Sequence, residues 1–94
     1  MAIVVRFAPK SVTTDKYDET VKHFEEVFGE GFMPDGCEMH VAFVDSDGNV
    51  RVSEIWDSRE KFEAFGEKLM PVLAEAGIDA GQPEVFEVHR LDKR

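Results

Sequence analysis

Residues 40–65, HVAFVDSDGNVRVSEIWDSREKFEAF, decide the fold of this chain. Two runs rich in β-branched and aromatic residues, Cys37–Val44 and Asn49–Trp56, flank the turn sequence DSDG. This pattern predicts a β-hairpin, because Asp, Ser and Gly are typical of tight turns between strands. Asp57, followed three residues later by Glu60, resembles a capping box and predicts that a helix begins directly after the hairpin.

The elements on either side of this stretch follow from the spacing of apolar residues. The runs Ala2–Phe7 and Glu84–Leu91 predict a first and a last strand. Apolar residues three or four positions apart predict two amphipathic helices. These residues are Tyr17, Val21, Phe24 and Phe28 in the first helix, and Phe62, Phe65, Leu69, Val72, Leu73 and Ala76 in the second. The order β-α-β-β-α-β predicts a ferredoxin-like α+β fold, with a four-stranded antiparallel sheet and both helices on one face.

Length and composition limit the classes of protein that the chain can belong to. The 94 residues predict one domain, residues 1–94, with one modest core. Twenty acidic against 11 basic residues give a net charge of −9, which disfavours nucleic acid and anionic membrane surfaces as partners. The apolar runs fall short of the roughly 18 residues of a membrane span, and we expect no secretory signal and a cytoplasmic protein. Cys37 is the one cysteine, so no internal disulfide forms.

The register of the hairpin predicts which side chains share a face of the sheet. A three-residue loop, with Gly48 in the left-handed region, would pair Asp45 with Asn49 and therefore His40 with Glu54. A two-residue turn would shift the pairing by one and separate His40 from Glu54. We prefer the first register because it keeps Glu54 out of the helix-covered core, where an unpaired charge is costly.

This register predicts two unlike faces. The helix-covered face would hold Ile3, Val5, Phe7, Met39, Val41, Phe43, Ile55, Phe86 and Val88. The open face would hold Val4, Arg6, His40, Ala42, Val44, Val50, Val52, Glu54, Trp56, Val85, Glu87, His89 and Leu91. Exposed apolar patches usually mark an interface, so we expect a homodimer through the open face. Two such sheets would close a dimeric α/β barrel, with the ionisable groups in a cavity between them.

The hairpin and the following helix also resemble a known group of proteins. A strand that ends in Glu-x-Trp, a short cap and a helix with Phe are similar to the dimeric α+β barrel superfamily. Within that superfamily the chain most resembles small proteins of the antibiotic-biosynthesis-monooxygenase type, and the resemblance covers most of the chain. It implies a ferredoxin-like dimer with a small-molecule cavity.

The resemblance also implies roles for single residues. Trp56 matches the tryptophan that often lines the cavity in this superfamily, and Glu54 matches the acid that precedes it. Members include cofactor-free oxygenases of polycyclic aromatics, haem-degrading enzymes and muconolactone-type isomerases. The histidine that many relatives carry early in the second helix corresponds to Phe65 here. Phenylalanine cannot bind iron, so the resemblance implies no haem.

His40 and Glu54 are the candidate catalytic pair. Glu54 could orient His40 and raise its basicity, which would leave a general base at neutral pH. The alternative is a structural hydrogen bond inside the dimer. A divalent metal on His40, Glu54 and His89 is conceivable, but their spacing does not require one, and we expect no metal and no cofactor. Tyr17 is expected to be a core residue.

The candidate residues for substrate binding are Trp56, Arg6, His89 and Glu87. Trp56 could stack on a flat aromatic ligand or anchor the interface. Arg6 or His89 could hold an anionic group, and Glu87 could complete the pocket or form an interchain salt bridge.

Two hypotheses for the function follow. The first is a cofactor-independent monooxygenase that acts on an aromatic or polyketide-like substrate. The second is a dimeric protein without catalytic activity, which binds a ligand or has a structural role. RNA binding through the open sheet is disfavoured, because that surface would offer one Trp among several acids.

Overall fold

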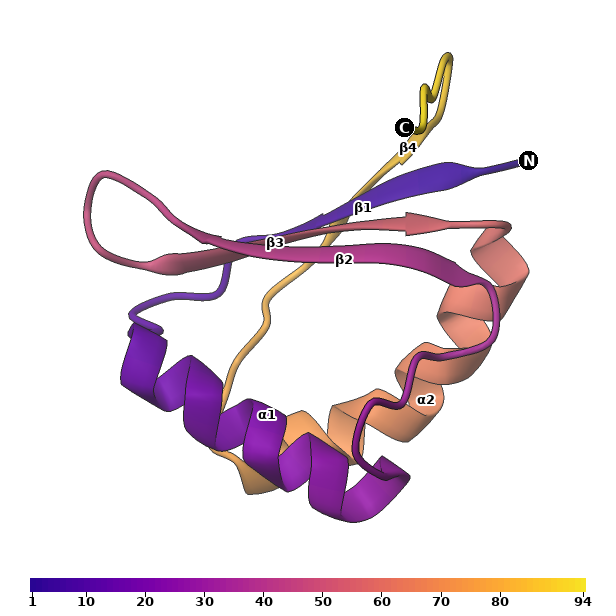
Figure 1. Cartoon of the computed structure of the whole chain (residues 1–94). Helices are drawn as coiled ribbons and strands as arrows, with labels where there is room; N and C mark the ends of the chain where they lie inside the picture. The colour runs from indigo at the N-terminus through magenta and orange to yellow at the C-terminus, as the bar shows by residue number, and fades with distance from the viewer.

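The computed structural model describes all 94 residues and confirms the predicted order of elements. The elements are β1 (Ile3–Phe7), α1 (Thr14–Phe28), β2 (Cys37–Val44), β3 (Val50–Trp56), α2 (Arg59–Glu75) and β4 (Glu84–Glu87). The strands form one antiparallel sheet in the order β2-β3-β1-β4, which is the ferredoxin-like arrangement. Both helices lie on the same side of this sheet (Figure 1). Neither helix has the length and apolar character needed to cross a bilayer.

The two helices begin where short polar side chains cap them. The Thr13 hydroxyl accepts a hydrogen bond from the Lys16 backbone N–H at 3.2 Å, as expected for an N-cap. At the second helix the cap is Ser58, whose hydroxyl accepts from the Lys61 N–H at 3.2 Å. The prediction that Asp57 caps this helix is therefore one residue early.

The β2–β3 hairpin has the predicted three-residue loop. Gly48 has a φ of 82°, and the Asp45 N–H donates to the Asn49 carbonyl at 2.9 Å. The left-handed conformation at Gly48 is one that glycine adopts at little cost. This loop sets the register that brings His40 directly opposite Glu54, as predicted.

The prediction of the two faces is correct for β1 and wrong for the other strands. Val5 is fully buried and lies opposite Glu54, which in turn lies opposite His40, so all three point toward the helices. Trp56, opposite Ile3, also points toward the helices. The side chains at the alternate positions point the other way. They leave an apolar open face made of Met39, Val41, Phe43, Ile55 and Phe86.

The hydrogen-bond partners of Glu54 explain why the predicted faces of these strands are opposite to the observed ones. The predicted assignment excluded this carboxylate from the helix-covered side as an unpaired charge. In the structure, Glu54 Oε2 lies 2.7 Å from His40 Nδ1, and Trp56 Nε1 donates to Glu54 Oε1 at 3.0 Å. The Glu54 side chain is 14% exposed, and a carboxylate with both oxygens hydrogen-bonded no longer carries the penalty on which the prediction relied.

Irregularities at the sheet edges account for two further differences. A bulge near the start of β2 places Cys37 opposite Trp56, one residue away from a regular continuation of the His40–Glu54 register. The last strand ends at Glu87 and is shorter than predicted. The segment after it rises above the open face (Figure 1), where Lys93 Nζ lies 2.7 Å from Glu38 Oε1.

Candidate functional site

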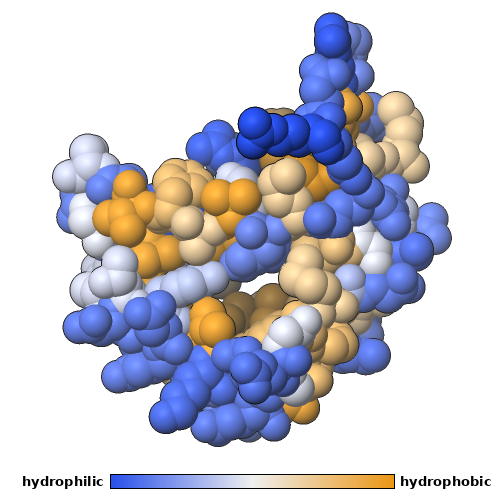
Figure 2. Space-filling model, in the orientation of Figure 1, coloured by the Kyte–Doolittle hydropathy of each residue, from blue (hydrophilic) through white to orange (hydrophobic).

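A cavity of about 360 Å³ lies between the sheet and the helices. Its volume falls in the range of roughly 300–1,000 Å³ that is typical of small-molecule sites. The space-filling view is hollowed at this place, between the sheet above and the helices below (Figure 2). We predicted a cavity between two protomers. The structure instead forms this cavity within a single chain, because His40 and Glu54 face the helices.

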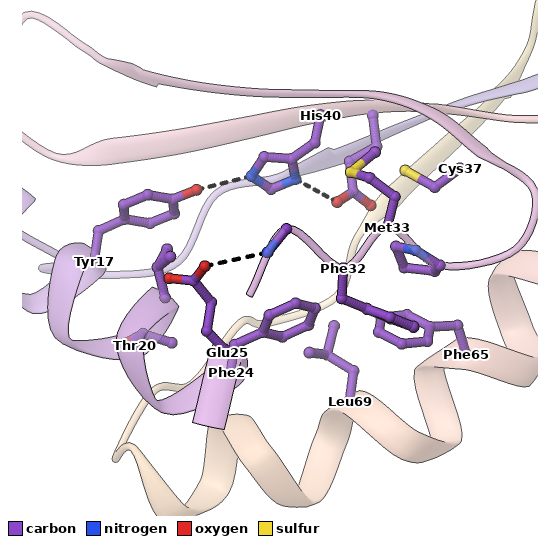
Figure 3. A pocket seen from close by; sticks show the side chains of 14 residues that line it. Tyr17, Thr20, Phe24, Glu25, Phe32, Met33, Cys37, His40, Phe65 and Leu69 are labelled. Carbon is purple, nitrogen blue, oxygen red and sulfur yellow. Dashed lines mark hydrogen bonds and ion pairs between the residues drawn. The ribbon is translucent and has the colours of Figure 1, made fainter. Parts of the chain in front are cut away.

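Four parts of the chain supply the lining of the cavity. From α1 come Tyr17, Thr20, Val21, Phe24 and Glu25, and from the α1–β2 loop come Gly31, Phe32, Met33 and Pro34. The sheet contributes Cys37, His40 and Glu54, and α2 contributes Phe65 and Leu69. Figure 3 shows the labelled members of this set turned toward a common space. Eight of the 14 lining residues are hydrophobic, so the cavity suits an apolar ligand that carries a few polar groups.

Aromatic rings form the lower part of the cavity (Figure 3). The Phe28 and Phe32 rings stack at 5.2 Å with an interplanar angle of 17°. Phe24 meets Phe65 edge-on at 6.2 Å. These offset and edge contacts are the arrangements that aromatic quadrupoles favour. The flat walls therefore keep their shape without a ligand.

A chain of hydrogen bonds forms the polar part of the cavity. Tyr17 Oη lies 2.8 Å from His40 Nε2, and His40 Nδ1 lies 2.7 Å from Glu54 Oε2 (Figure 3). An ionised Glu54 can only accept, so His40 donates to it from Nδ1, and a neutral imidazole then accepts from the Tyr17 hydroxyl at Nε2. The indole N–H of Trp56 holds the other carboxylate oxygen. We call Tyr17, His40 and Glu54 the hydrogen-bonded triad.

The environment of the cavity raises the pKa values of two of its side chains, Tyr17 and Cys37. Burial raises the pKa of the Tyr17 hydroxyl, and the nearby carboxylates of Glu54 and Asp18 raise it further. Burial and the Glu54 charge raise the pKa of the Cys37 thiol to about 11, although a hydrogen bond to the Met39 carbonyl opposes the shift. Both groups are therefore neutral at physiological pH, and Glu54 contributes to both shifts.

The other predicted site residues lie outside this cavity. Arg6 is exposed on the open face, and His89 is exposed beyond the end of β4. Glu87 is exposed, faces the same side of the sheet as Ile3, and lines a different surface hollow. Trp56 is 1% exposed and packs against Phe62 and Phe65. Within this chain, its ring is part of the core.

Of the 14 residues that line the cavity, sequence reasoning named only His40 and Glu54 as site residues. Tyr17 was expected in the core, and Glu25 and Phe32 were not singled out. Tyr17 carried a usable signal, because it is the one polar member of an otherwise apolar helical stripe. Glu25 follows Phe24 directly and lies beside that stripe. No signal indicated Phe32, because its position depends on the path of the α1–β2 loop.

Comparisons with known proteins support the fold. No protein-family model and no curated protein matches the sequence. Among solved structures, SnoaB from Streptomyces nogalater, described as a cofactor-independent oxygenase, superposes with a TM-score of 0.61 at 16% identity, over 96% of this chain and 93% of SnoaB. The chain has the ferredoxin-like fold of this oxygenase.

Two further solved structures are similar over nearly their whole length. A protein from Deinococcus radiodurans, provisionally named an antibiotic biosynthesis monooxygenase, gives a TM-score of 0.60 at 13% identity and covers 100% of this chain and 98% of its own. A provisionally named monooxygenase from Shewanella loihica gives 0.62 at 20% identity, with 96% of each chain covered. The fold expected from the resemblance to antibiotic-biosynthesis-monooxygenase-like proteins is thus confirmed.

Proposed function

We propose that this chain is a cofactor-independent oxygenase that acts on a flat phenolic substrate bound in the cavity between the sheet and the helices. The observation that carries the proposal is the hydrogen-bonded triad, whose Tyr17 and His40 line a cavity with walls of Phe24, Phe32 and Phe65. A base at one end and flat apolar walls elsewhere fit a phenol that must lose a proton. The shared fold with SnoaB supports the proposal at the level of architecture.

Proton removal is the step that these residues could assist. His40 Nε2 is the basic atom, and Glu54 stabilises the imidazolium that forms when it takes a proton. Because Tyr17 Oη occupies this nitrogen, the substrate proton passes to the Tyr17 oxygen while the Tyr17 proton moves to His40. The resulting phenolate is electron-rich enough to reduce oxygen directly. The ring carbon para to the phenolate gains one oxygen atom, two hydrogens leave the substrate, and the second oxygen atom departs as water.

The remaining predicted residues have other roles in this proposal. Trp56 positions Glu54 through its indole N–H and does not form the stacking wall, a role that falls to Phe32 and Phe65. Arg6, His89 and Glu87 do not line the cavity, so they have no part in holding the substrate of the same chain in this proposal. No metal or other cofactor enters the reaction as written.

We further propose that a second copy of the chain covers the open face of the sheet. Met39, Val41, Phe43 and Phe86 each remain 40–50% exposed there. Contiguous apolar surface of this kind is typical of protein–protein interfaces. A homodimer formed in this way would leave both cavities intact, because each lies on the far side of its own sheet.

Oxygen uptake tests the enzymatic proposal. We expect the protein to consume oxygen with a bicyclic or tricyclic phenol as the sole added reductant. His40→Ala should reduce the rate by roughly 10²- to 10⁴-fold, the usual contribution of a general base. His89→Ala is the matched control and should retain the rate, because His89 lies outside the cavity. Ligand binding without oxygen uptake would instead favour the non-catalytic binding protein.

A further inference from the structure

The charged groups of the cavity are all of one sign. Glu25 and Glu54 line it, and the lining contains no lysine or arginine. Glu54 uses both oxygens in hydrogen bonds to His40 and Trp56. Glu25 has only a long hydrogen bond, at 3.4 Å, from the Gly31 N–H. Its carboxylate therefore has most of its capacity as an acceptor free.

The position of Glu25 makes this charge relevant to a ligand. The side chain leaves α1 between Tyr17 and the phenylalanines, and its carboxylate points into the space below His40 (Figure 3). Ion pairs within 4.0 Å involve other carboxylates of α1 and α2 but not Glu25. A bound ring that reaches His40 must therefore pass close to an uncompensated negative charge.

The other titratable groups that face the cavity do not cancel this charge. They are Tyr17 from α1 and Cys37 and His40 from β2. Helix α2 contributes only the apolar Phe65 and Leu69. Burial is the main cause of the raised pKa values of Tyr17 and Cys37, and the negative charge of Glu54 adds to both. A protonated His40 would be balanced by Glu54, which leaves Glu25 unbalanced.

We infer that the cavity accepts aromatic ligands that are uncharged when they bind, and that Glu25 is the specificity residue that rejects anionic ones. The inference rests on the proposed function and adds the charge class of the substrate. An anionic ring would bring like charges close together, and such juxtaposition is unfavourable.

Proton transfer within the site is compatible with a cavity that accepts uncharged ligands and rejects anionic ones. A neutral phenol that enters the cavity adds no charge. When its proton moves to the triad, the phenolate forms beside the imidazolium of His40, and the total charge of the cavity does not change. The negative potential therefore opposes the entry of an anion but not the formation of one inside.

The test compares two ligands that share one ring system. Calorimetric titration at neutral pH would measure the dissociation constants of 2-naphthol, which is neutral, and 2-naphthoate, which is anionic. We expect 2-naphthol to bind at least about tenfold more tightly, since like charges in an interface cost more than the 1.4 kcal/mol of one decade.

Variants on the same helix separate the charge of Glu25 from desolvation of the ligand, which alone would disfavour a carboxylate. Glu25→Gln keeps the size of the side chain and removes its charge, so the preference for 2-naphthol should shrink several-fold. Glu26→Gln makes the same change of net charge at the next position, outside the cavity lining, and should leave the preference unchanged.

The possible results distinguish this inference from the proposed function. Equal affinity for the two ligands, or the same preference in Glu25→Gln as in the wild type, would overturn the charge selection and leave the oxygenase proposal standing. If neither compound binds, the cavity is not a site for small aromatic ligands, and both proposals are wrong. Tighter binding of 2-naphthoate would contradict the inference directly.

Discussion

A single carboxylate, Glu54, organises the interior of this protein. It accepts hydrogen bonds from His40 on the neighbouring strand and from Trp56 two residues along its own strand. Removing one partner from a hydrogen-bonded set of this kind leaves the other partners without their hydrogen bonds, which is a cost beyond the loss of a single bond. The hydrogen bond from Nδ1 to Glu54 therefore fixes the His40 ring in one orientation, in which its other nitrogen, Nε2, meets the Tyr17 hydroxyl.

Tyr17 supplies the first prediction at this scale. Tyr17→Phe removes the hydroxyl that bridges the substrate and His40 while it keeps the ring that lines the cavity. We expect the rate of oxygen uptake to fall by roughly 10²-fold or more, with the affinity for 2-naphthol within a few-fold of the wild type. Steady-state kinetics together with calorimetry would measure the two effects separately. A parallel loss of affinity and rate would mean that the hydroxyl only binds the ligand.

The second prediction concerns the Cys37 thiol. The folded protein holds the pKa of this thiol at about 11, against 9.0 for an ordinary thiol. The thiolate is the reactive form, so iodoacetamide should modify the folded protein near pH 9 several-fold more slowly than the urea-unfolded protein. The folded rate should then rise with a midpoint near pH 11. Equal rates near pH 9 would contradict the shift.

The same shift has a consequence for stability. A thiol whose pKa is higher in the folded state keeps its proton there at pH values at which the unfolded chain has lost it. Its stabilising contribution is complete below about pH 9 and is lost as the pH rises toward 11.

At the scale of elements, the α1–β2 loop closes one side of the cavity and depends on glycine. Gly36 has a φ of 90°, and a β-carbon there would lie 2.5 Å from Lys61 Cδ and 2.9 Å from its Cβ. The Gly36 carbonyl also accepts from the Asp57 N–H at 2.8 Å, which ties the loop to the end of β3. A side chain at this position would disturb both the loop and the start of α2.

Two glycine-to-alanine substitutions should therefore have opposite effects. Gly36→Ala should lower the free energy of unfolding by about 1–2 kcal/mol, because alanine is strained at positive φ and would collide with Lys61. Gly66→Ala, inside α2 with open space around it, should raise that free energy by up to about 1 kcal/mol. Urea denaturation followed by circular dichroism would measure both. Equal effects would show that backbone strain at Gly36 is negligible.

The elements also show how far sequence reasoning reaches. Turn chemistry at Gly48 and the spacing of apolar residues correctly predicted the strand order and the pairing of His40 with Glu54. Sequence reasoning did not predict which side chains of β2 and β3 point toward the helices, because that depends on whether Glu54 has hydrogen-bond partners. One of these partners, Trp56, was expected to stack on a flat ligand or to anchor the interface. The contact of Tyr17 with His40 depends on how α1 crosses the sheet, which no local pattern encodes.

At the scale of the whole molecule, the apolar open face and the cavity lie on opposite sides of the sheet. The residues of the open face are apolar enough to pair with a second copy, and Figure 2 shows apolar side chains along the upper part of the molecule, where the sheet lies. A change of oligomeric state should therefore leave the cavity nearly unaffected.

Sedimentation velocity would test this arrangement. We expect the wild type to sediment as a dimer and Val41→Glu, in the middle of β2 on the open face, to sediment as a monomer, because a charge buried in the interface there has no partner. Val27→Glu is the matched control: Val27 is 51% exposed on α1, away from the open face, and its substitution should leave the dimer intact. A monomeric wild type would refute the proposed interface.

The residues of β2 point alternately toward the cavity and toward the open face of the sheet. Along β2, His40 and Ala42 belong to the interior side, and Met39, Val41 and Phe43 belong to the exterior side. Because side chains alternate strictly and the hairpin loop sets the register, inserting one residue between Val44 and Asp45 would turn the strand inside out. The imidazole would then leave the cavity, and the apolar row would leave the open face. Insertions and deletions in this strand should therefore be far less tolerated than point substitutions, since one such event abolishes two properties together.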